Sequence, residues 1–581
     1  MTNEQFLQQF GHFADAPNGI QKLRELILQL AVQGKLVTQD SKDEPASVLL
    51  DNAKSEKALL IQKKIIKKGK ATPDLDAFEF QFEMPSSWEL CRFVDVAYII
   101  RGVTFPASAK SQSPGDGLVV CLRSGNIQQQ VVWNDLLYIP ESYVKNRGQY
   151  IQDKDILISM ANSYELVGKV ALVNEVDTPA VIGGFIGAIR CIGTDSEYMS
   201  VYLRSPWVQL KFRESSSQTT NIANISIGQT NQLPIPIPPL AEQLRIVAKA
   251  GELMVLCDQL ETERNARAET HQRLIRAVHH PLIEASDASA TQTAWHRIRD
   301  NFANLYVTLE SVQALRQTIL QLAVQGELVE QADGDTSPAE LLKKVALKRK
   351  KLVGDGKIRN IKSTPFVESS TAPYTLPNNW IWVHPDEVSD IDNNALAIGP
   401  FGSNLLKSDY RDQGVPLVFV KDIRSEFATL PKNYIDNSKA VELKSHSVCP
   451  GDLLITKMGD PPGDTAIYPE NRPCAVITAD CIKWTLADQL VNARFLYFVL
   501  RAPIILEQIL DITKGAAHQK VSLKRFRRIC LPLPPLEEQH RIVAKIDQLM
   551  TLCGQLEASI RNKNDIATCY TEAIVQQIAA A

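Results

Sequence analysis

The sequence LRELILQLAVQGKLV at residues 23–37 occurs again as LRQTILQLAVQGELV at residues 315–329, with 12 of 15 positions identical. The two copies lie 315 − 23 = 292 residues apart. A solenoid repeats every ~20–50 residues. The much longer period found here therefore predicts two domain-sized units instead of a stack of small ones.

A second repeated segment lies late in each half of the chain. The sequence PIPPLAEQLRIVAKAGELMVLCDQLE at residues 236–261 matches PLPPLEEQHRIVAKIDQLMTLCGQLE at residues 532–557 at 18 of 26 positions. Shorter matches in the same order are PASVLL (45–50) with PAELLK (338–343), MPSSW (84–88) with LPNNW (376–380), and DILIS (155–159) with DLLIT (452–456). The 581 residues therefore contain one unit of about 290 residues, present twice.

Between these matched segments the two halves differ, as residues 100–150 and 395–440 show. Two copies of one sequence diverge least where both keep the same task. They diverge most where each copy has its own ligand. The comparison predicts a constant frame that carries two variable inserts with different ligands.

The repeated late segments predict long helices. In the second copy, apolar side chains recur at alternating steps of four and three residues, which is the spacing of a heptad seam: Ile542, Ile546, Leu549, Cys553, Leu556 and Ile560. In the first copy, one helix is expected over residues 241–280, about 60 Å long at ~1.5 Å per residue, with Pro281 as its stop. After the polar stretch 284–293, a helical run over 294–326 is expected to return and complete an antiparallel pair.

The early repeated segment predicts a helix as well. Apolar residues recur at helical spacing from Ile20 to Ala31, before Gly34. The copy runs from Val312 to Gly326. Two interpretations stay open, namely a plain core helix and a helix that docks on a partner helix.

The inserts consist of short β-rich runs separated by Gly, Pro, Asn and Asp, followed by helical stretches near 197–213 and 492–511. Each insert is expected to be a mixed α/β globule of about 150 residues. The predicted fold class is α+β, with two mixed α/β domains joined by long antiparallel helices in an internal pseudo-two-fold repeat. The predicted parts are a helical segment at 1–80, insert domain 1 at 81–235, a central helical spacer at 236–373, insert domain 2 at 374–531 and a final helix at 532–581.

Composition excludes several classes of protein. The 63 Lys and Arg and 66 Asp and Glu give 63 − 66 = −3, so a uniformly basic coat is excluded and local basic patches are not. The ten cysteines include no CxxC pair, which favours reduced, mostly buried thiols in a cytoplasmic protein. Neither a secretory signal nor an apolar run of ~18 residues is recognisable.

With the doubled ILQLAVQG-LV, the P-x-x-W motif, the D-I/L-L-I strand and PPL-x-EQ-x-RIVAK, the chain closely resembles the specificity (S) subunit of type I restriction–modification systems. One of these motifs alone would be weak. The duplicated set, in this order, covers essentially the whole chain and is highly specific.

The resemblance implies that each insert is a target-recognition domain that reads one half of a bipartite, asymmetric sequence in double-stranded DNA. The helices would hold the two domains apart and thereby set the number of unread base pairs between the half-sites. Two adenine-N6 methyltransferase subunits and two motor/nuclease subunits would bind this frame. The chain itself would carry no catalysis, and S-adenosylmethionine, ATP and Mg are expected on the partner subunits.

Base reading requires Arg, Lys, Asn, Gln, Ser or Thr in accessible loops. The candidates in insert 1 are Arg101, Arg123, Asn126, Lys211, Arg213, Ser217, Gln218 and Thr220. The candidates in insert 2 are Ser403, Asn404, Lys407, Lys421, Lys457, Lys514, His518, Gln519 and Lys520. For any one position, an ordinary solvated turn residue remains the competing interpretation.

Two further sets of residues have candidate binding roles. The leucines expected to join the helices or bind the methyltransferase are Leu253, Leu256, Leu260, Leu549, Leu552 and Leu556. The basic runs KKIIKKGK (63–70), KRKK (348–351) and KRFRR (524–528) could contact phosphates or form a solvated helix face.

Catalytic motifs are not recognisable. The sequence DPPG at 460–463 lacks the aromatic residue that an amino-methyltransferase needs after its prolines, and it is expected to form a turn. Neither a phosphate-binding G-x4-GK[ST] loop nor a zinc motif is present in the sequence. Two alternatives stay open: the recognition subunit of a methylation-only system, and an interaction scaffold that does not bind DNA.

Overall fold

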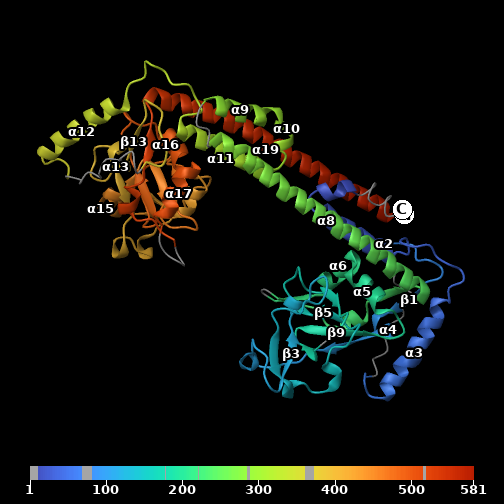
Figure 1. Cartoon of the computed structure of the whole chain (residues 1–581). Helices are drawn as coiled ribbons and strands as arrows, with labels where there is room; N and C mark the ends of the chain where they lie inside the picture. Colours follow the sequence, from blue (N-terminus) through green and yellow to red (C-terminus); the bar gives the residue numbers. More distant parts are fainter. Residues whose placement is uncertain are drawn as a thin grey trace. The chain divides into compact units, whose positions relative to one another are not determined.

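The computed structural model describes residues 11–67, 82–176, 178–219, 222–283, 288–359, 372–513 and 519–580. The chain forms two compact units. Unit 1 comprises Met1–Ala268 and Lys563–Ala581, and unit 2 comprises Glu269–Asn562. Each unit contains a mixed α/β insert domain and helices from the repeated segments (Figure 1), which confirms the predicted α+β class and the internal repeat.

The two insert domains contain corresponding pairs of sheets, and the second sheet has three strands in unit 1 and four in unit 2. In unit 1, an antiparallel sheet has the strand order β2-β9-β5-β7, and a second sheet, β4-β3-β8, pairs β3 with β8 in parallel. Unit 2 has the corresponding orders β14-β21-β18-β19 and β16-β15-β20-β17. The strands of unit 1 are β2 (Ala97–Arg101), β3 (Leu118–Leu122), β4 (Leu137–Pro140), β5 (Ile156–Ser159), β7 (Val170–Leu172), β8 (Ala180–Ile182) and β9 (Ile186–Cys191). Those of unit 2 are β14 (Leu396–Ile398), β15 (Val415–Val418), β16 (Tyr434–Ile435), β17 (Ser447–Val448), β18 (Leu453–Thr456), β19 (Thr465–Ile467), β20 (Ala475–Ile477) and β21 (Cys481–Trp484).

The two ends of each insert domain are paired with each other. In unit 1, β1 (Glu89–Arg92) pairs antiparallel with β12 (Pro234–Ile237). In unit 2, β13 (Ile381–Val383) pairs with β22 (Leu531–Leu533) in the same way. Each insert domain therefore begins and ends at a single point of its frame.

The repeated segments form the predicted helices, which are α2 (Gly19–Val32), α8 (Leu240–Ile283), α11 (Leu309–Gln325) and α19 (Leu536–Ala580). Helix α8 starts in unit 1 and ends in unit 2, and α19 runs from unit 2 to unit 1, so the two are antiparallel (Figure 1). In unit 1, Leu253 and Cys257 of α8 pack with Leu23 of α2, and Ile578 of α19 covers the same cluster.

In unit 2 the roles of the two long helices are exchanged. Ile546 and Cys553 of α19 share a core cluster with Val312 of α11, and Leu282 near the end of α8 joins this cluster. The heptad seam of each long helix is thus buried, and the removal of its apolar side chains from water is what stabilises helices of this length.

Three predicted helical stretches are interrupted. The run 294–326 is divided into α9 (Ala288–Asp300), α10 (Phe302–Leu305) and α11, because the Thr308 side chain caps the first turn of α11 by accepting from the Ser311 N–H. The stretches 197–213 and 492–511 are each two helices, α5 (Ser196–Arg204) with α6 (Pro206–Ser215) and α16 (Ala493–Leu500) with α17 (Pro503–Asp511). Proline occupies the first position of α6 and of α17 and ends the helix before it.

Two expectations about single residues are wrong. Helix α8 continues through Pro281 and ends at Ile283. The expectation of thiols throughout fails at Cys449 and Cys474, which form a disulfide. The reason is the sheet register. Val448 of β17 pairs with Ala475 of β20, so their neighbours Cys449 and Cys474 lie opposite each other.

The motifs shared by the halves meet at a contact that we call the frame junction. In unit 1, Gly34 follows α2 with φ +71°, and a Cβ atom there would lie 2.5 Å from Pro85 Cγ and 3.1 Å from Trp88 Cζ2. In unit 2, Gly326 has φ +80° and would place its Cβ 2.4 Å from Pro377 Cγ. The glycine of ILQLAVQG and the P-x-x-W motif are repeated because each fits against the other.

Two further side chains fasten the frame junction. Gln243, at the start of α8, accepts from the Asp195 N–H at 2.9 Å and donates to the Pro238 carbonyl at 2.9 Å. Gln539 of α19 makes the corresponding bonds to the Asn492 N–H and the Pro534 carbonyl. Asp195 caps the domain helix that begins at Ser196, and Asn492 caps the one that begins at Ala493, so each Gln ties a frame helix to a domain helix.

An ion pair occupies the same place in both units. Arg245 binds both carboxylate oxygens of Asp43 at 3.1 and 2.6 Å, and Arg541 binds those of Asp335 at 3.0 and 2.6 Å. The guanidinium group lowers the pKa of Asp43 and of Asp335, mainly through these hydrogen bonds. A bidentate ion pair requires both an Arg and a carboxylate, and this requirement explains why the Arg of PPL-x-EQ-x-RIVAK is repeated.

We expect Gly326→Ala to lower the free energy of unfolding by about 2 kcal/mol or more, because alanine is disfavoured at this φ and its methyl group would overlap Pro377. Urea unfolding of the full chain measures the change. Gly251→Ala is the matched control, since Gly251 lies within α8 with no atom within 4 Å of its Cβ position. That variant should gain up to about 1 kcal/mol. Equal effects at the two positions would contradict the frame junction.

Acid should weaken unit 2 through His279. Burial of the imidazole lowers the pKa of His279 to about 4. The ring lies 2.8 Å from Tyr306 Oη and 2.9 Å from Thr318 Oγ1. An unfolded histidine titrates near ~6.5 and binds its proton first, so stability should fall between about pH 6.5 and about pH 4, by roughly 3 kcal/mol in total. Amide hydrogen exchange of residues 306–325 measures this loss. His279→Gln should flatten the pH dependence of this stability. An unchanged pH dependence in the variant would refute the role of His279.

Candidate nucleic-acid interface

In both insert domains, chain segments gather at the edge where β5 or β18 ends, which we call the loop edge. In unit 1, Arg101 at the end of β2 pairs with Gly187, and Ser159 at the end of β5 pairs with Ile186. In unit 2, Ile398 and Thr456 flank the start of β21 in the same way, through Ile482 and Cys481. Strand topology thus brings together loops that are distant in sequence.

The polar segment after the second domain helix also reaches the loop edge. In unit 1, β10 (Ser217–Thr219) pairs with β11 (Ile222–Asn224), which pairs with β6 (Ala161–Asn162) just after β5. In unit 2, Met458 forms a bridge with Lys520, and the Val521 N–H donates to the Lys457 carbonyl. Residues 217–219 and 519–520 thus have equivalent places at the loop edges. Thr220, Lys514 and His518 lie outside the described residues.

Several candidates are exposed to solvent. These are Arg101, Ser217 and Gln218 in unit 1, and Ser403, Asn404, Lys407, Lys421 and Lys520 in unit 2. Gln519 is half-buried. Lys211 pairs with Glu214 at 2.9 Å, and Arg123 pairs with Asp135 at 2.7 Å. Exposed pairs of this kind contribute only about 0–1 kcal/mol, so either cation can exchange its partner for a phosphate.

Asn126 has an internal role that the sequence did not indicate. Its side chain is 3% exposed, accepts from the Arg123 N–H and donates to the carbonyls of Val132 and Asn134. The amide therefore holds its own loop together and does not face solvent. Asp422 in unit 2 accepts from the Phe419 N–H in the same way.

Lys457 is also largely buried. Its side chain is 7% exposed, Nζ donates to the Ala479 carbonyl at 3.1 Å, and Nζ lies 4.1 Å from the ring centroid of Phe401. Burial lowers the pKa of this ammonium group. Lys457 thus supports Phe401, which is itself 53% exposed at the loop edge.

Exposed aromatic residues were missing from the sequence candidates. Phe185, just before β9 at the loop edge of unit 1, is 67% exposed, and Phe401 follows β14 at the loop edge of unit 2. An aromatic ring in solvent beside polar loops can stack on a base or a sugar. The signal was present in the sequence, since both residues sit in glycine-rich turns, VIGGF and IGPFG.

Most of the leucines assigned to helix contacts pack within the chain. Leu253, Leu256 and Leu260 are buried in the core of unit 1, and Leu549 and Leu556 pack on the core of unit 2. Leu552 differs from them, with 54% of its surface exposed on α19.

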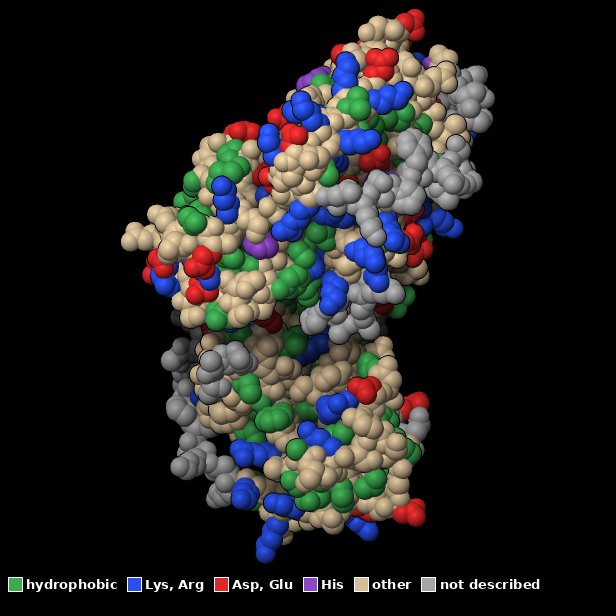
Figure 2. Space-filling model, turned by 90° about the vertical axis from the view of Figure 1, so that its left-hand side faces the viewer, with side chains coloured by type: hydrophobic (Ala, Val, Ile, Leu, Met, Phe, Trp, Pro, Cys, Tyr) green, Lys and Arg blue, Asp and Glu red, His purple; other side chains and the backbone are tan. Residues whose placement is uncertain are grey.

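The basic runs divide into bonded and exposed members. Arg349 of α12 (Pro338–Gly354) donates to the carbonyls of Asp386 and Ser389, and Arg527 pairs with Asp386 at 3.2 Å. Lys63 and Lys64 are exposed after α3 (Ala46–Gln62). On the face drawn in Figure 2, Lys and Arg side chains are scattered among hydrophobic ones and are more frequent than Asp and Glu.

The carboxylates that could suggest a nuclease have structural roles. Asp155 is 2% exposed and binds Arg190 at 2.8 Å, and Asp452 accepts from the Cys449 N–H. Gly463 of DPPG has φ +108° in the turn between β18 and β19, as expected. Within the described ranges, no three His, Cys, Asp or Glu side chains are grouped to hold a metal ion. No described helix is long and apolar enough to cross a bilayer.

Two insert domains with corresponding sheets and different loops, each attached to a copy of the same frame, make up the chain. Residues 85–270 and 406–563 match the family model for the "Type I restriction modification DNA specificity domain". These ranges contain 186 + 158 = 344 of the 581 residues. The chain belongs to this family.

Known relatives span nearly the whole chain. The specificity subunit of the type I restriction enzyme EcoAI from Escherichia coli is 29% identical over 96% of this chain and 94% of its own length. The EcoEI specificity subunit from Escherichia coli is 28% identical over 94% of this chain and 91% of its own length. The solved HsdS subunit from Thermoanaerobacter tengcongensis aligns over 87% of this chain and 99% of its own, with 19% identity and a TM-score of 0.35.

The internal role of Asn126 leads to a direct test. Asn126→Ala should lower the stability of unit 1 by about 1–3 kcal/mol, because it leaves one N–H and two carbonyls of the loop without their partner. Denaturant unfolding and hydrogen exchange of residues 123–135 report this loss. Asn404→Ala, at an exposed position, should change stability by no more than about 0.5 kcal/mol. An Asn126→Ala chain that is fully stable would contradict the internal role.

Proposed function

We propose that this chain is the sequence-specific DNA-recognition subunit of a type I restriction–modification complex. Each insert domain reads one half of a bipartite target in double-stranded DNA. The observation that carries the proposal is the constant frame junction beside two divergent loop edges. Since the loop edges differ in sequence while the frames match, the two half-sites are expected to differ, and the whole target is expected to be asymmetric.

The loop edges have the chemistry that base reading requires. Arg101, Ser217 and Gln218 in unit 1 and Ser403 and Asn404 in unit 2 offer exposed donors and acceptors. Arg and Lys match guanine, and Asn and Gln match adenine in the major groove. Lys407 and Lys421 supply exposed charge for phosphates in unit 2.

The long helices set the separation of the half-sites and bind the partner subunits. Helix α8 has 44 residues and α19 has 45, and each begins in one unit and ends in the other. A continuous helix transmits a fixed length, so half-site spacing follows from the frame. The exposed Leu552 is the surface leucine we assign to a contact with methyltransferase.

In this proposal the chain is not an enzyme and binds no cofactor of its own. Two adenine-N6 methyltransferase subunits supply S-adenosylmethionine, and two motor/nuclease subunits use ATP and Mg. A complex without the motor subunits would act in methylation only. A scaffold that does not bind DNA is the alternative from another class, and it gives no role to the divergent polar loop edges.

Selection from a random DNA library tests the proposal. The full chain, purified with its methyltransferase subunits, should enrich one split sequence with two unlike halves. Exchanging residues 395–440 for the corresponding segment of a relative should change the bases of one half only. The control is Lys63→Ala, outside both loop edges, which should leave the selected bases unchanged. Enrichment of no sequence at all, with an intact complex, would refute DNA recognition.

A further inference from the structure

Unit 1 contains a groove of about 710 Å³ between its frame helices and its insert domain. Leu28 of α2 and Met254 of α8 form one side. Lys169, Arg204 and Arg213 line the other, together with Gln128. The groove therefore lies between a constant wall and a variable one.

Three cations of this groove have no acidic partner among the described residues of the chain. Lys169 Nζ donates to the neutral amide of Gln128 at 2.7 Å. Arg204 is half-buried, and burial and the nearby Arg24 both lower the pKa of its guanidinium group. Arg213 lies in the last turn of α6 and also lines the groove. In contrast, Arg24 is neutralised by Asp258 at 2.6 Å and Glu261 at 2.7 Å.

The equivalent groove of unit 2 serves as an internal comparison. It is smaller, about 230 Å³, and its lining includes Asp464, Arg501 and Arg424. Asp464 stands where unit 1 has Lys169, and it accepts from Arg424 Nε at 2.7 Å. Arg501 stands where unit 1 has Arg204, and it is paired with Glu426.

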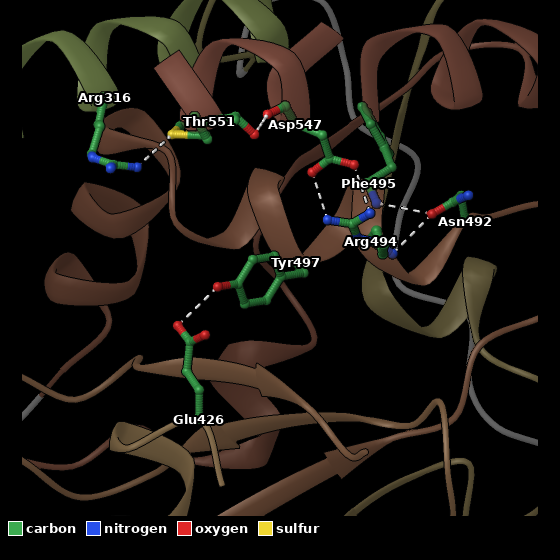
Figure 3. A network of polar contacts seen from close by, with 9 residues as sticks. Arg316, Glu426, Asn492, Arg494, Phe495, Tyr497, Asp547 and Thr551 are labelled. Atoms are coloured by element: carbon green, nitrogen blue, oxygen red, sulfur yellow. Dashed lines mark hydrogen bonds and ion pairs between the residues drawn. The ribbon is translucent and has the colours of Figure 1, made fainter. Parts of the chain in front are cut away.

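Figure 3 shows polar contacts of Glu426, Arg494 and their partners in unit 2. Glu426 also accepts from Tyr497 Oη at 2.9 Å, and Arg494 binds both oxygens of Asp547 at 2.6 and 2.5 Å. The position of Arg213 is taken by Leu510. Glu25 also lines the unit 1 groove, and it pairs with Lys22 at 3.6 Å. The same place in the fold therefore has three cations without an ion-pair partner in the described part of unit 1 and satisfied pairs in unit 2.

We propose that the unit 1 groove binds phosphates of the DNA backbone and that the unit 2 groove does not. A partly buried guanidinium without an anion is unfavourable, and a phosphate satisfies its planar donors in a bidentate contact. DNA is favoured because Gln128, Gln129 and Arg213 line the groove and lie in or next to segments that carry DNA-contact candidates. The inference rests on the proposed function and adds that unit 1 holds DNA with more charge than unit 2.

The test is the salt dependence of DNA binding by the full chain with its methyltransferase subunits. Each phosphate contact contributes about 0.9 to the slope of log K against log salt concentration. Lys169→Met with Arg204→Met should therefore reduce the slope by about 1–2, and weaken specific and random DNA alike, with the selected bases unchanged. Arg501→Met is the matched control in unit 2 and should leave the slope unchanged.

Glu426→Gln provides a second test, in which the slope is expected to increase. It releases Arg501 from its acid, and the slope should rise by up to about 1. An unchanged slope in both Lys169→Met/Arg204→Met and Glu426→Gln, while the wild type still selects a split sequence, would overturn the groove and leave the proposed function intact. Loss of methyltransferase binding with an unchanged slope would overturn it too, and would identify an acidic protein segment as the ligand. A wild type that selects no sequence refutes the proposed function, and this inference with it.

Discussion

The contact on which the rest of the structure depends is the packing of Trp88 and Pro85 on Gly34, repeated as Trp380 and Pro377 on Gly326. A helix can end there only with a residue that adopts positive φ and carries no Cβ. The indole and the proline ring then fill the space that a side chain would take. This contact fixes where each insert domain leaves its frame.

The same junction contains a buried carboxylate in each unit. Glu242 and Glu538 lie at the start of α8 and α19 with no exposed surface. Burial raises the pKa of both, and neither carboxylate has a hydrogen-bond partner among the described residues. Since isolated buried charge is unfavourable, this environment favours the protonated form of each side chain.

A rigid junction explains how the insert domains can differ so much. The strand pairs β1–β12 and β13–β22 close each domain at its base, so changes in the distant loops do not disturb the helices. Loops at the edge of a packed sheet tolerate substitution because they carry little of the core. The grooves beside the two junctions show the same freedom, since Arg204 and Arg501 share a place in the fold and have different partners.

The sequence alone determined the duplication, the α+β class, the long antiparallel helices and the family, because a repeat of 12 in 15 residues and a heptad seam are local signals. Asn126 and Lys457 were chosen as DNA contacts by residue type and turn position. Only the tertiary structure showed that both are buried, with Asn126 bonded to carbonyls of its own loop and Lys457 bonded to the Ala479 carbonyl. It also decided the disulfide and the unequal charge of the two grooves. The physical reason is that burial and pairing depend on segments brought together by sheet register and helix packing, and spacing along one chain does not contain that information.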